Sequence, residues 1–87
     1  IEGANFSNLD GFYKETDRLL MGGGRSGRNL DAFNDLLRGG FGVFDYGTPI
    51  KIVWNNFARS KQQLGRETTD TLVEIIRSHT HIEFEKR

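Results

Sequence analysis

The sequence predicts a small α/β domain in which helices cover a parallel β-sheet. Two short runs have strand character, Ile50 to Trp54 and His81 to Glu85, and residues with helical spacing lie before and between them. Strands that are joined through helices favour right-handed crossovers and a parallel sheet. A chain of 87 residues forms one modest hydrophobic core and has no room for a large internal substrate cavity. We therefore expect a single domain over residues 1–87 and no cleft between two domains.

Cysteine is absent from the sequence, which excludes a disulfide framework, a thiol nucleophile and thiolate metal ligands. Hydrophobic residues make up 36% of the chain and charged residues 28%, values typical of a folded domain. No stretch approaches the roughly 20 apolar residues of a membrane-spanning helix, and no charged start followed by an apolar run indicates a signal peptide. These features favour a cytoplasmic protein.

The formal net charge is zero, because twelve basic residues balance twelve acidic ones. A protein built to hold polyanions through phosphate contacts would carry an excess of positive charge, so direct nucleic-acid binding is not expected. The segment 29–49 is nevertheless locally acidic, and its charged residues are Asp31, Asp35, Arg38 and Asp45. Electrostatic attraction of a partner must therefore be local.

The first helix is predicted over Asn8 to Leu20. Ser7 and Asp10 have the Ser-x-x-Asp spacing of a helix start. The apolar residues that follow recur at helical spacing: Leu9, Phe12, Tyr13, Leu19 and Leu20. Gly22 to Gly24 then predict the end of this helix and the beginning of a flexible loop.

A short second helix is predicted within the stretch Gly27 to Leu37, after the favourable N-cap residue Asn29. Its apolar stripe consists of Leu30, Phe33 and Leu37, and its polar stripe consists of Asp31, Asn34, Asp35 and Arg38. Like charges four residues apart destabilise a helix by about 0.2–0.5 kcal/mol. The helix dipole favours an anion in the first turn, which explains Asp31 but not Asp35. Two interpretations stay open: an ordinary solvated face, or a docking helix that binds a partner.

The glycine-rich segment Gly39 to Thr48 is predicted to be a loop. Its large side chains are expected to pack partly on the core, because together they would otherwise form an exposed apolar patch; they are Phe41, Val43, Phe44 and Tyr46. Pro49 then precedes the strand Ile50 to Trp54, and a proline is tolerated at the start of a strand.

The last third of the chain predicts two helices and a strand. An asparagine at position 55 or 56 is expected to cap a helix that ends near Leu64. Gly65 separates this helix from the next one, which includes Asp70 to Ser78 and has a broad apolar face. His81 to Glu85 alternates apolar and charged residues, which predicts a half-buried strand.

The docking helix and the segment after it carry two motifs. The first, Gly-x-Asn-Leu-Asp-Ala-x-x-Asp, consists of Gly27, Asn29, Leu30, Asp31, Ala32 and Asp35. The second is a Pro-led apolar strand ending in Trp, then a Phe and a Ser-Lys-Gln run, and consists of Pro49 to Trp54, Phe57 and Ser60 to Gln62. In this order the motifs resemble the barstar family, from about Asn5 to Phe84. The resemblance implies a small three-stranded parallel sheet packed with about four helices, with most of the first strand before Ile1.

The resemblance also implies a function. Barstar-like proteins inhibit microbial ribonucleases, so we expect a bacterial toxin-immunity or self-protection protein that is not an enzyme, is a monomer when free and needs no cofactor or metal. Asp35 would replace the substrate phosphate in the nuclease, and Asp31 would pair with a neighbouring base. The other residues expected at the contact are Gly27, Asn29, Leu30, Asn34, Arg38, Gly39 and Glu74.

Some residues of this chain differ from the family pattern, and these differences affect which partner it is expected to bind. Where well-known members carry aromatic residues, this chain has Arg25, Ser26 and Asn34, which indicates a different target nuclease because aromatic anchors contribute much of the affinity of an interface. An alternative hypothesis is an anion-binding module centred on Arg25 and Arg28. Another is an adaptor with a barstar-like fold and a partner that is not a ribonuclease, because fold does not determine function.

Sequence patterns for catalysis and metal binding are incomplete. Gly22-x-Gly24-x-x-Gly27 matches the dinucleotide-binding string, but it follows a predicted helix and not a strand. His79 and His81 have no third ligand that the sequence places beside them. We therefore expect neither a cofactor nor a metal site.

Overall fold

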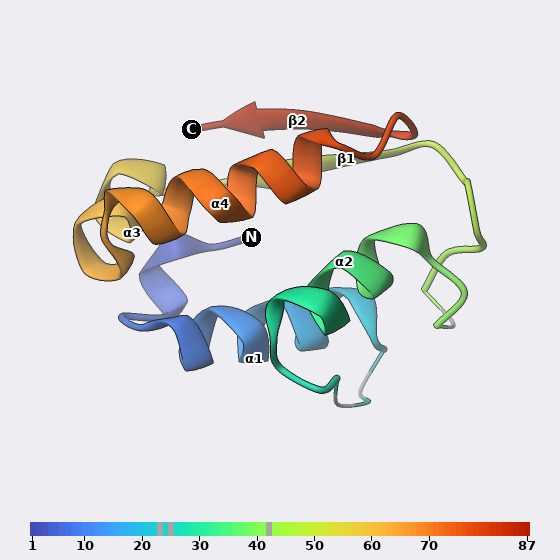
Figure 1. Cartoon of the computed structure of the whole chain (residues 1–87), viewed down its shortest axis with the longest axis horizontal. Helices are drawn as coiled ribbons and strands as arrows, with labels where there is room; N and C mark the ends of the chain where they lie inside the picture. The colour runs from blue at the N-terminus through green and yellow to red at the C-terminus, as the bar shows by residue number, and fades with distance from the viewer. Residues whose placement is uncertain (23, 25, 42) are drawn as a thin grey trace.

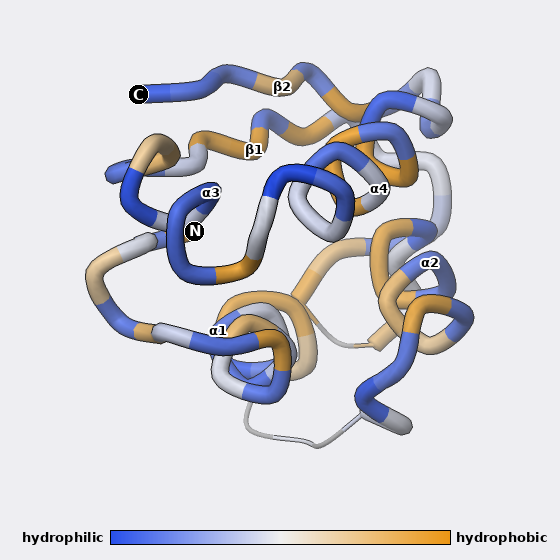
Figure 2. Tube along the Cα trace, turned by 60° about the vertical axis from the view of Figure 1, so that its left-hand side comes forward, coloured by the Kyte–Doolittle hydropathy of each residue, from blue (hydrophilic) through white to orange (hydrophobic). Residues whose placement is uncertain are grey.

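The computed structural model describes residues 1–22, 24, 26–41 and 43–87. Its elements are, in chain order, the 3-10 helix η1 (Gly3–Asn5), α1 (Leu9–Leu20), α2 (Leu30–Arg38), β1 (Ile50–Trp54), α3 (Phe57–Leu64), α4 (Arg66–Arg77) and β2 (Ile82–Lys86). Figures 1 and 2 show the two strands at one side of the molecule, α1 and α2 at the other side, and α4 between them. The predicted α/β class with four α-helices is confirmed.

The sheet consists of β1 and β2, which run parallel. Ile50 pairs with Ile82 at one end, and Trp54 pairs with Lys86 at the other. The connection between the strands passes through α3 and α4, and α4 packs against β2. The predicted parallel pairing of these two strands is therefore confirmed.

The predicted third strand is not found among the described residues, and the sheet has two strands. In its place, Glu2 forms a single parallel bridge with Asn55 beside the end of β1. The amino group of Ile1 donates a hydrogen bond to the carbonyl oxygen of Val53 at 2.7 Å, and the N–H of Gly3 donates to that of Asn55 at 2.8 Å. The chain turns into η1 directly after this bridge, so the pairing does not extend into a strand.

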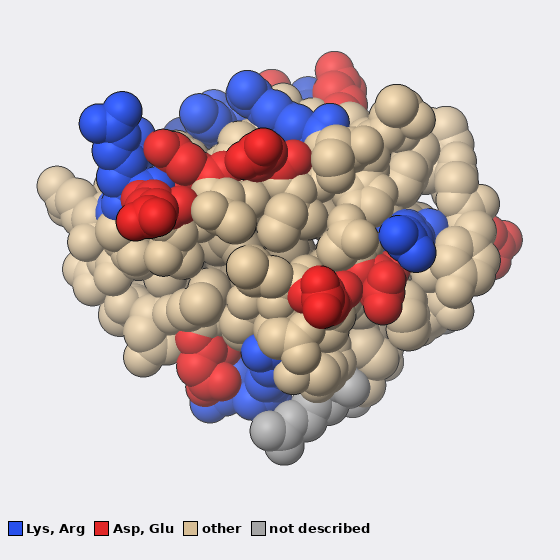
Figure 3. Space-filling model, viewed as in Figure 1, with Lys and Arg blue, Asp and Glu red and all other residues tan. Residues whose placement is uncertain are grey.

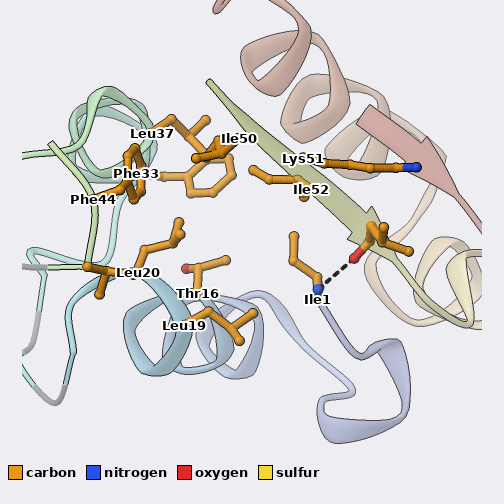
Figure 4. A pocket seen from close by; sticks show the side chains of 12 residues that line it. Ile1, Thr16, Leu19, Leu20, Phe33, Leu37, Phe44, Ile50, Lys51 and Ile52 are labelled. Atoms are coloured by element: carbon orange, nitrogen blue, oxygen red, sulfur yellow. Dashed lines mark hydrogen bonds between the residues drawn. The ribbon is translucent and has the colours of Figure 1, made fainter. Parts of the chain in front are cut away.

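The rest of this edge of β1 borders an open hydrophobic groove of about 340 Å³. Side chains of α1, α2 and β1 surround the groove, among them Leu20, Phe33 and Ile50 (Figure 4). Ile1 also lines the groove, and burial lowers the pKa of its amino group. The bridge at the N-terminus thus covers only the last part of the β1 edge.

The hydrophobic core surrounds Trp54, whose side chain is fully buried. Its ring stacks on Phe12 with the ring centroids 5.1 Å apart and meets Phe57 edge-on at 5.1 Å. Phe12 in turn meets Phe33 edge-on at 5.2 Å. These contacts join α1, α2, β1 and α3 in one cluster, and Figure 2 shows hydrophobic residues along α1, α2 and β1. One side of α2 is therefore packed into the core.

Asparagines cap the first two helices. The side-chain oxygen of Asn8 accepts the backbone N–H of Gly11, and that of Asn29 accepts the N–H of Ala32, both at 2.8 Å. The predicted cap Asn29 is thus confirmed. The first helix begins at Leu9, because Asn8 is its cap and not its first residue.

The third helix lacks the predicted side-chain cap, whereas the fourth begins where the sequence predicts. Asn56 precedes α3 but makes no capping bond, and its side-chain amide donates to Glu2 instead. α4 begins at Arg66, directly after the predicted separator Gly65, and ends at Arg77 with Ser78 as its C-cap. In the described part of the chain, every helix is too short or too polar to cross a membrane.

The loop before β1 exposes more hydrophobic surface than the sequence predicts. Phe44 is half-buried, but Phe41 is 38%, Val43 48% and Tyr46 72% exposed. The expected packing on the core is therefore wrong for Tyr46. Gly40 has a φ of 85°, and a Cβ atom there would lie 2.5 Å from the ring of Tyr46. The tyrosine ring packs on this glycine and not on the core.

Candidate partner-binding site

α2 separates a buried hydrophobic side from an exposed acidic side. Phe33, Leu36 and Leu37 are buried in the core, whereas Asp31 and Asp35 are exposed. Figure 3 shows acidic side chains over α2 on an open face of the molecule. Close packing of large side chains on one side fixes the helix backbone that carries the carboxylates of the other side. The predicted two-sided character of this helix, apolar on one side and polar on the other, is confirmed.

A basic residue on the same helix lies beside Asp35. Nη1 of Arg38 is 3.6 Å from Oδ1 of Asp35, and the two side chains are 58% and 60% exposed. Exposed ion pairs of this kind contribute about 0–1 kcal/mol to stability. Asp35 can therefore exchange Arg38 for a cation of a partner at little cost.

The predicted residues at the N-terminal end of α2 lie together on the surface. Gly27 and Asn29 are exposed, and Leu30 is 41% exposed although the sequence places it on the apolar stripe. Because the side-chain oxygen of Asn29 caps the helix at Ala32, its side-chain NH₂ group remains the outward donor. This end of α2 offers polar and apolar groups beside Asp31.

Arg28 is paired inside the protein. Its Nε lies 3.3 Å from Oδ2 of Asp17, and its Nη1 lies 3.8 Å from Oδ1 of Asp10. The Arg28 side chain is 22% exposed. A guanidinium group that already faces two carboxylates is a poor ligand for a further anion. This arrangement argues against an anion site at Arg28, and Arg25 lies outside the described residues.

Two histidines that precede β2 form hydrogen bonds with residues of α2. Nε2 of His79 is 2.8 Å from Oδ1 of Asn34, and Nε2 of His81 is 2.7 Å from the carbonyl oxygen of Leu37. Burial lowers the pKa of His79, and the nearby His81 and Arg38 lower it further. Asn34, which the sequence predicts at the partner contact, is half-buried and bonded to this histidine.

Both histidines of the pair face α2. The two rings meet edge-on with their centroids 5.6 Å apart, and each Nε2 faces a group of α2. Within residues 1–22, 24, 26–41 and 43–87, no group of three or more His, Cys, Asp or Glu residues is placed to hold a metal ion.

The remaining predicted residues lie at the C-terminal end of α2 and on α4. Gly39 is buried with a φ of 91°, and a Cβ atom there would lie 2.6 Å from the carbonyl oxygen of Asp45. Glu74 is exposed on α4, which packs against α2. Figure 3 shows acidic side chains over α4 on the same face as those over α2. The structure therefore brings α2 and α4 together at one acidic face.

Two residues at this site were not predicted from the sequence. Tyr46 stands exposed beside the C-terminal end of α2, where the N–H of Gly47 donates to the carbonyl oxygen of Arg38 at 3.4 Å. Asp17 lies on α1 and contacts the loop before α2. The only sequence signal for Tyr46 was the glycines around it, and Asp17 had none.

Comparison with known proteins finds one family. The family model described as Barstar (barnase inhibitor) matches residues 1–86. No curated protein matches the chain. The family match extends from the N-terminal bridge to the end of β2 and includes every residue of the candidate site.

Proposed function

Because this chain belongs to the barstar family, we propose that it is an inhibitor that binds a microbial ribonuclease and covers its active site. Members of this family are inhibitors and not enzymes. The observation that carries the proposal is the exposed pair Asp31 and Asp35 on the outer side of α2, whose inner side is buried in the core.

Asp35 is the proposed mimic of the substrate phosphate. A ribonuclease holds the scissile phosphate with Arg, Lys and His side chains, and a carboxylate accepts charge-assisted hydrogen bonds from the same groups. Because the core packs against α2, the backbone that carries the carboxylate needs little further ordering when it binds. Asp31 pairs with a neighbouring base in this proposal. The separate roles of the two aspartates, and the dominance of Asp35, come from the family resemblance.

The other proposed contacts surround the two aspartates. Gly27 and Asn29 form the rim at the N-terminal end of α2, and Leu30 forms a hydrophobic edge, as their exposure permits. Arg38 lies beside Asp35. Asn34, Gly39 and Glu74 complete the proposed contact set, with Asn34 and Gly39 the more enclosed of the three.

Attraction between inhibitor and ribonuclease is proposed to be local, because the chain has a formal net charge of zero and therefore no strong long-range field. In this proposal the free protein is a monomer. It protects a bacterial cell against a ribonuclease in the cytoplasm, and the target differs from barnase because the aromatic anchors of well-known members are replaced.

Titration of a panel of microbial ribonucleases with the protein tests the proposal. The panel includes any small nuclease encoded beside this gene. We expect stoichiometric inhibition of one member. Asp35→Ala should weaken that inhibition by at least about 2 kcal/mol, or about 30-fold, because truncation of a charged hot spot leaves a buried cation of the partner unpaired.

Asp70→Ala is the matched control. Asp70 is also an exposed helical aspartate, and its Oδ2 lies 3.7 Å from Nε of Arg66. The Asp70→Ala variant should inhibit the ribonuclease as strongly as the wild-type protein does. If the folded wild-type protein inhibits no panel member, the ribonuclease proposal fails, and the adaptor hypothesis gains support.

A further inference from the structure

Asp17 is a buried carboxylate on α1 that contacts the loop leading into α2. The residue is 4% exposed. Its Oδ2 accepts the backbone N–H of Ser26 at 3.2 Å and the Nε–H of Arg28 at 3.3 Å. Its Oδ1 is buried and has no hydrogen-bond partner among the described residues. The side-chain bonds of Asp17 that the structure describes therefore all go to this loop.

Stability alone does not explain a buried aspartate at this place. A buried carboxylate is costly even when it is paired, and replacement of a buried ion pair by well-packed apolar residues is often neutral or stabilising. The unpartnered Oδ1 atom adds to the cost. What the carboxylate of Asp17 provides is a defined position for Ser26 and Arg28.

The loop has a conformation that benefits from such an anchor. Arg28 has a φ of 52°, a left-handed conformation that is uncommon for a residue other than glycine. Its N–H also donates to Oγ of Ser26 at 3.1 Å. Gly27 lies between these two residues, and Asn29 follows directly as the cap of α2. The bonds from Asp17 therefore determine where Gly27 and Asn29 lie relative to α2.

We propose that Asp17 is a positioning residue for partner binding. Through Arg28 it holds the loop so that Gly27 and Asn29 meet the partner together with the carboxylates of α2. This inference rests on the proposed function and assigns Arg28 a role as the link between α1 and the rim. A loop that is ordered before binding raises affinity, because less conformational freedom is lost in the complex.

Glu15 offers a matched control on the same helix. It is 5% exposed, and its Oε1 lies 2.9 Å from Nη2 of Arg18. Its carboxylate holds the N–H of Glu2 at 2.8 Å and the side chain of Asn5 at 3.2 Å. These residues belong to the N-terminal segment and not to the proposed contact. Loss of the Glu15 charge should reduce stability without disturbing the rim.

The test compares Asp17→Asn with Glu15→Gln by thermal unfolding, amide hydrogen exchange and ribonuclease inhibition. Both variants are expected to lower Tm. Only Asp17→Asn should accelerate exchange at the amide of Ser26, which loses its carboxylate acceptor. Asp17→Asn should weaken inhibition by about tenfold or more, whereas Glu15→Gln should stay within about twofold of the wild type.

Arg28→Gln keeps the proposal testable if Asp17→Asn does not fold. It should weaken inhibition as Asp17→Asn does, and the double variant should be no weaker than either single one, because the two residues act as one unit. The proposal is overturned if the Asp17 and Glu15 variants lose affinity only in proportion to their loss of Tm. It is also overturned if exchange at Ser26 accelerates while inhibition is unchanged.

The exchange measurement separates this inference from the proposed function, because it needs no partner. Equal exchange rates at the amide of Ser26 in the wild type and in Asp17→Asn would show that Asp17 does not order this loop. Slow exchange in the wild type, together with no inhibited ribonuclease, would confirm the anchor but contradict its proposed role in ribonuclease binding.

Discussion

The indole N–H of Trp54 donates a hydrogen bond to Oγ of Ser60 at 2.9 Å, and both side chains are fully buried. This bond joins the end of β1 to α3. It also connects the strand that ends in Trp with the Ser-Lys-Gln run, the two parts of the second barstar-like motif. A buried indole N–H needs a partner, and Ser60 supplies it. The pairing gives these motif residues a structural role that is separate from partner binding.

Ser60→Ala should destabilise the fold by about 1–3 kcal/mol, because the buried N–H of Trp54 would lose its acceptor. Urea unfolding of the variant measures this loss. Thr69→Val is the control, because the hydroxyl of Thr69 is buried and has no partner among the described residues; its removal should be neutral or stabilising. Equal destabilisation by the two substitutions would contradict the role of the Trp54–Ser60 bond.

The lowered pKa of His79 predicts a loss of stability in mild acid. Burial, then His81 and Arg38, lower this pKa from its ordinary value of 6.5. The unfolded chain therefore takes up the proton more readily than the folded one. The stability contributed by neutral His79 is fully present above pH 6.5 and is lost as the pH falls below that value through the lower folded-state pKa. Unfolding curves measured between about pH 8 and pH 5 should show this decrease.

His79→Gln provides the comparison for this pH dependence. Glutamine does not titrate, and its amide can still bond to Asn34, so the variant should lose less stability than the wild type over the same pH range. An unchanged slope would show that His79 does not cause the acid sensitivity.

Local sequence patterns were sufficient to predict the elements that form the site. The bounds of β1 and the cap of α2 agree with the prediction, because apolar periodicity and capping act within a few residues. The acidic outer side of α2 follows from the same periodicity. The link from Asp17 to Arg28 could not be predicted, because it joins side chains of two elements whose packing no local pattern specifies.

The exposure of Tyr46 and the absence of a third strand from the described residues also depend on contacts that no local sequence pattern specifies. The large side chains around Tyr46 were expected to pack on the core, but the ring of Tyr46 packs on Gly40, which has a positive φ. The third strand was expected from the family resemblance, and the described residues contain only the bridge between Glu2 and Asn55. Burial and strand pairing depend on the whole fold and not on a single segment.

Tyr46→Ala should weaken ribonuclease inhibition by about 1 kcal/mol or more, because exposed aromatic side chains are frequent anchors of interfaces. Its Tm should change little, since the side chain is 72% exposed. Inhibition assays and thermal unfolding of the same preparation test both expectations. Tyr46→Phe keeps the ring and should inhibit nearly as well as the wild type. Full activity of Tyr46→Ala would place this loop outside the interface.

Removal of Arg38 should strengthen inhibition. In the free protein Nη1 of Arg38 lies 3.6 Å from Oδ1 of Asp35, so a cation of the ribonuclease must displace it, and a positive side chain beside a cationic active site is repelled. Arg38→Ala should therefore raise the association rate by about two- to tenfold in stopped-flow measurements at low salt. Arg66→Ala removes a similar exposed pair, with Asp70 on α4, and should leave the rate unchanged. Slower association of Arg38→Ala would mean that the partner presents an acidic group to Arg38, which a purely cationic active site does not contain.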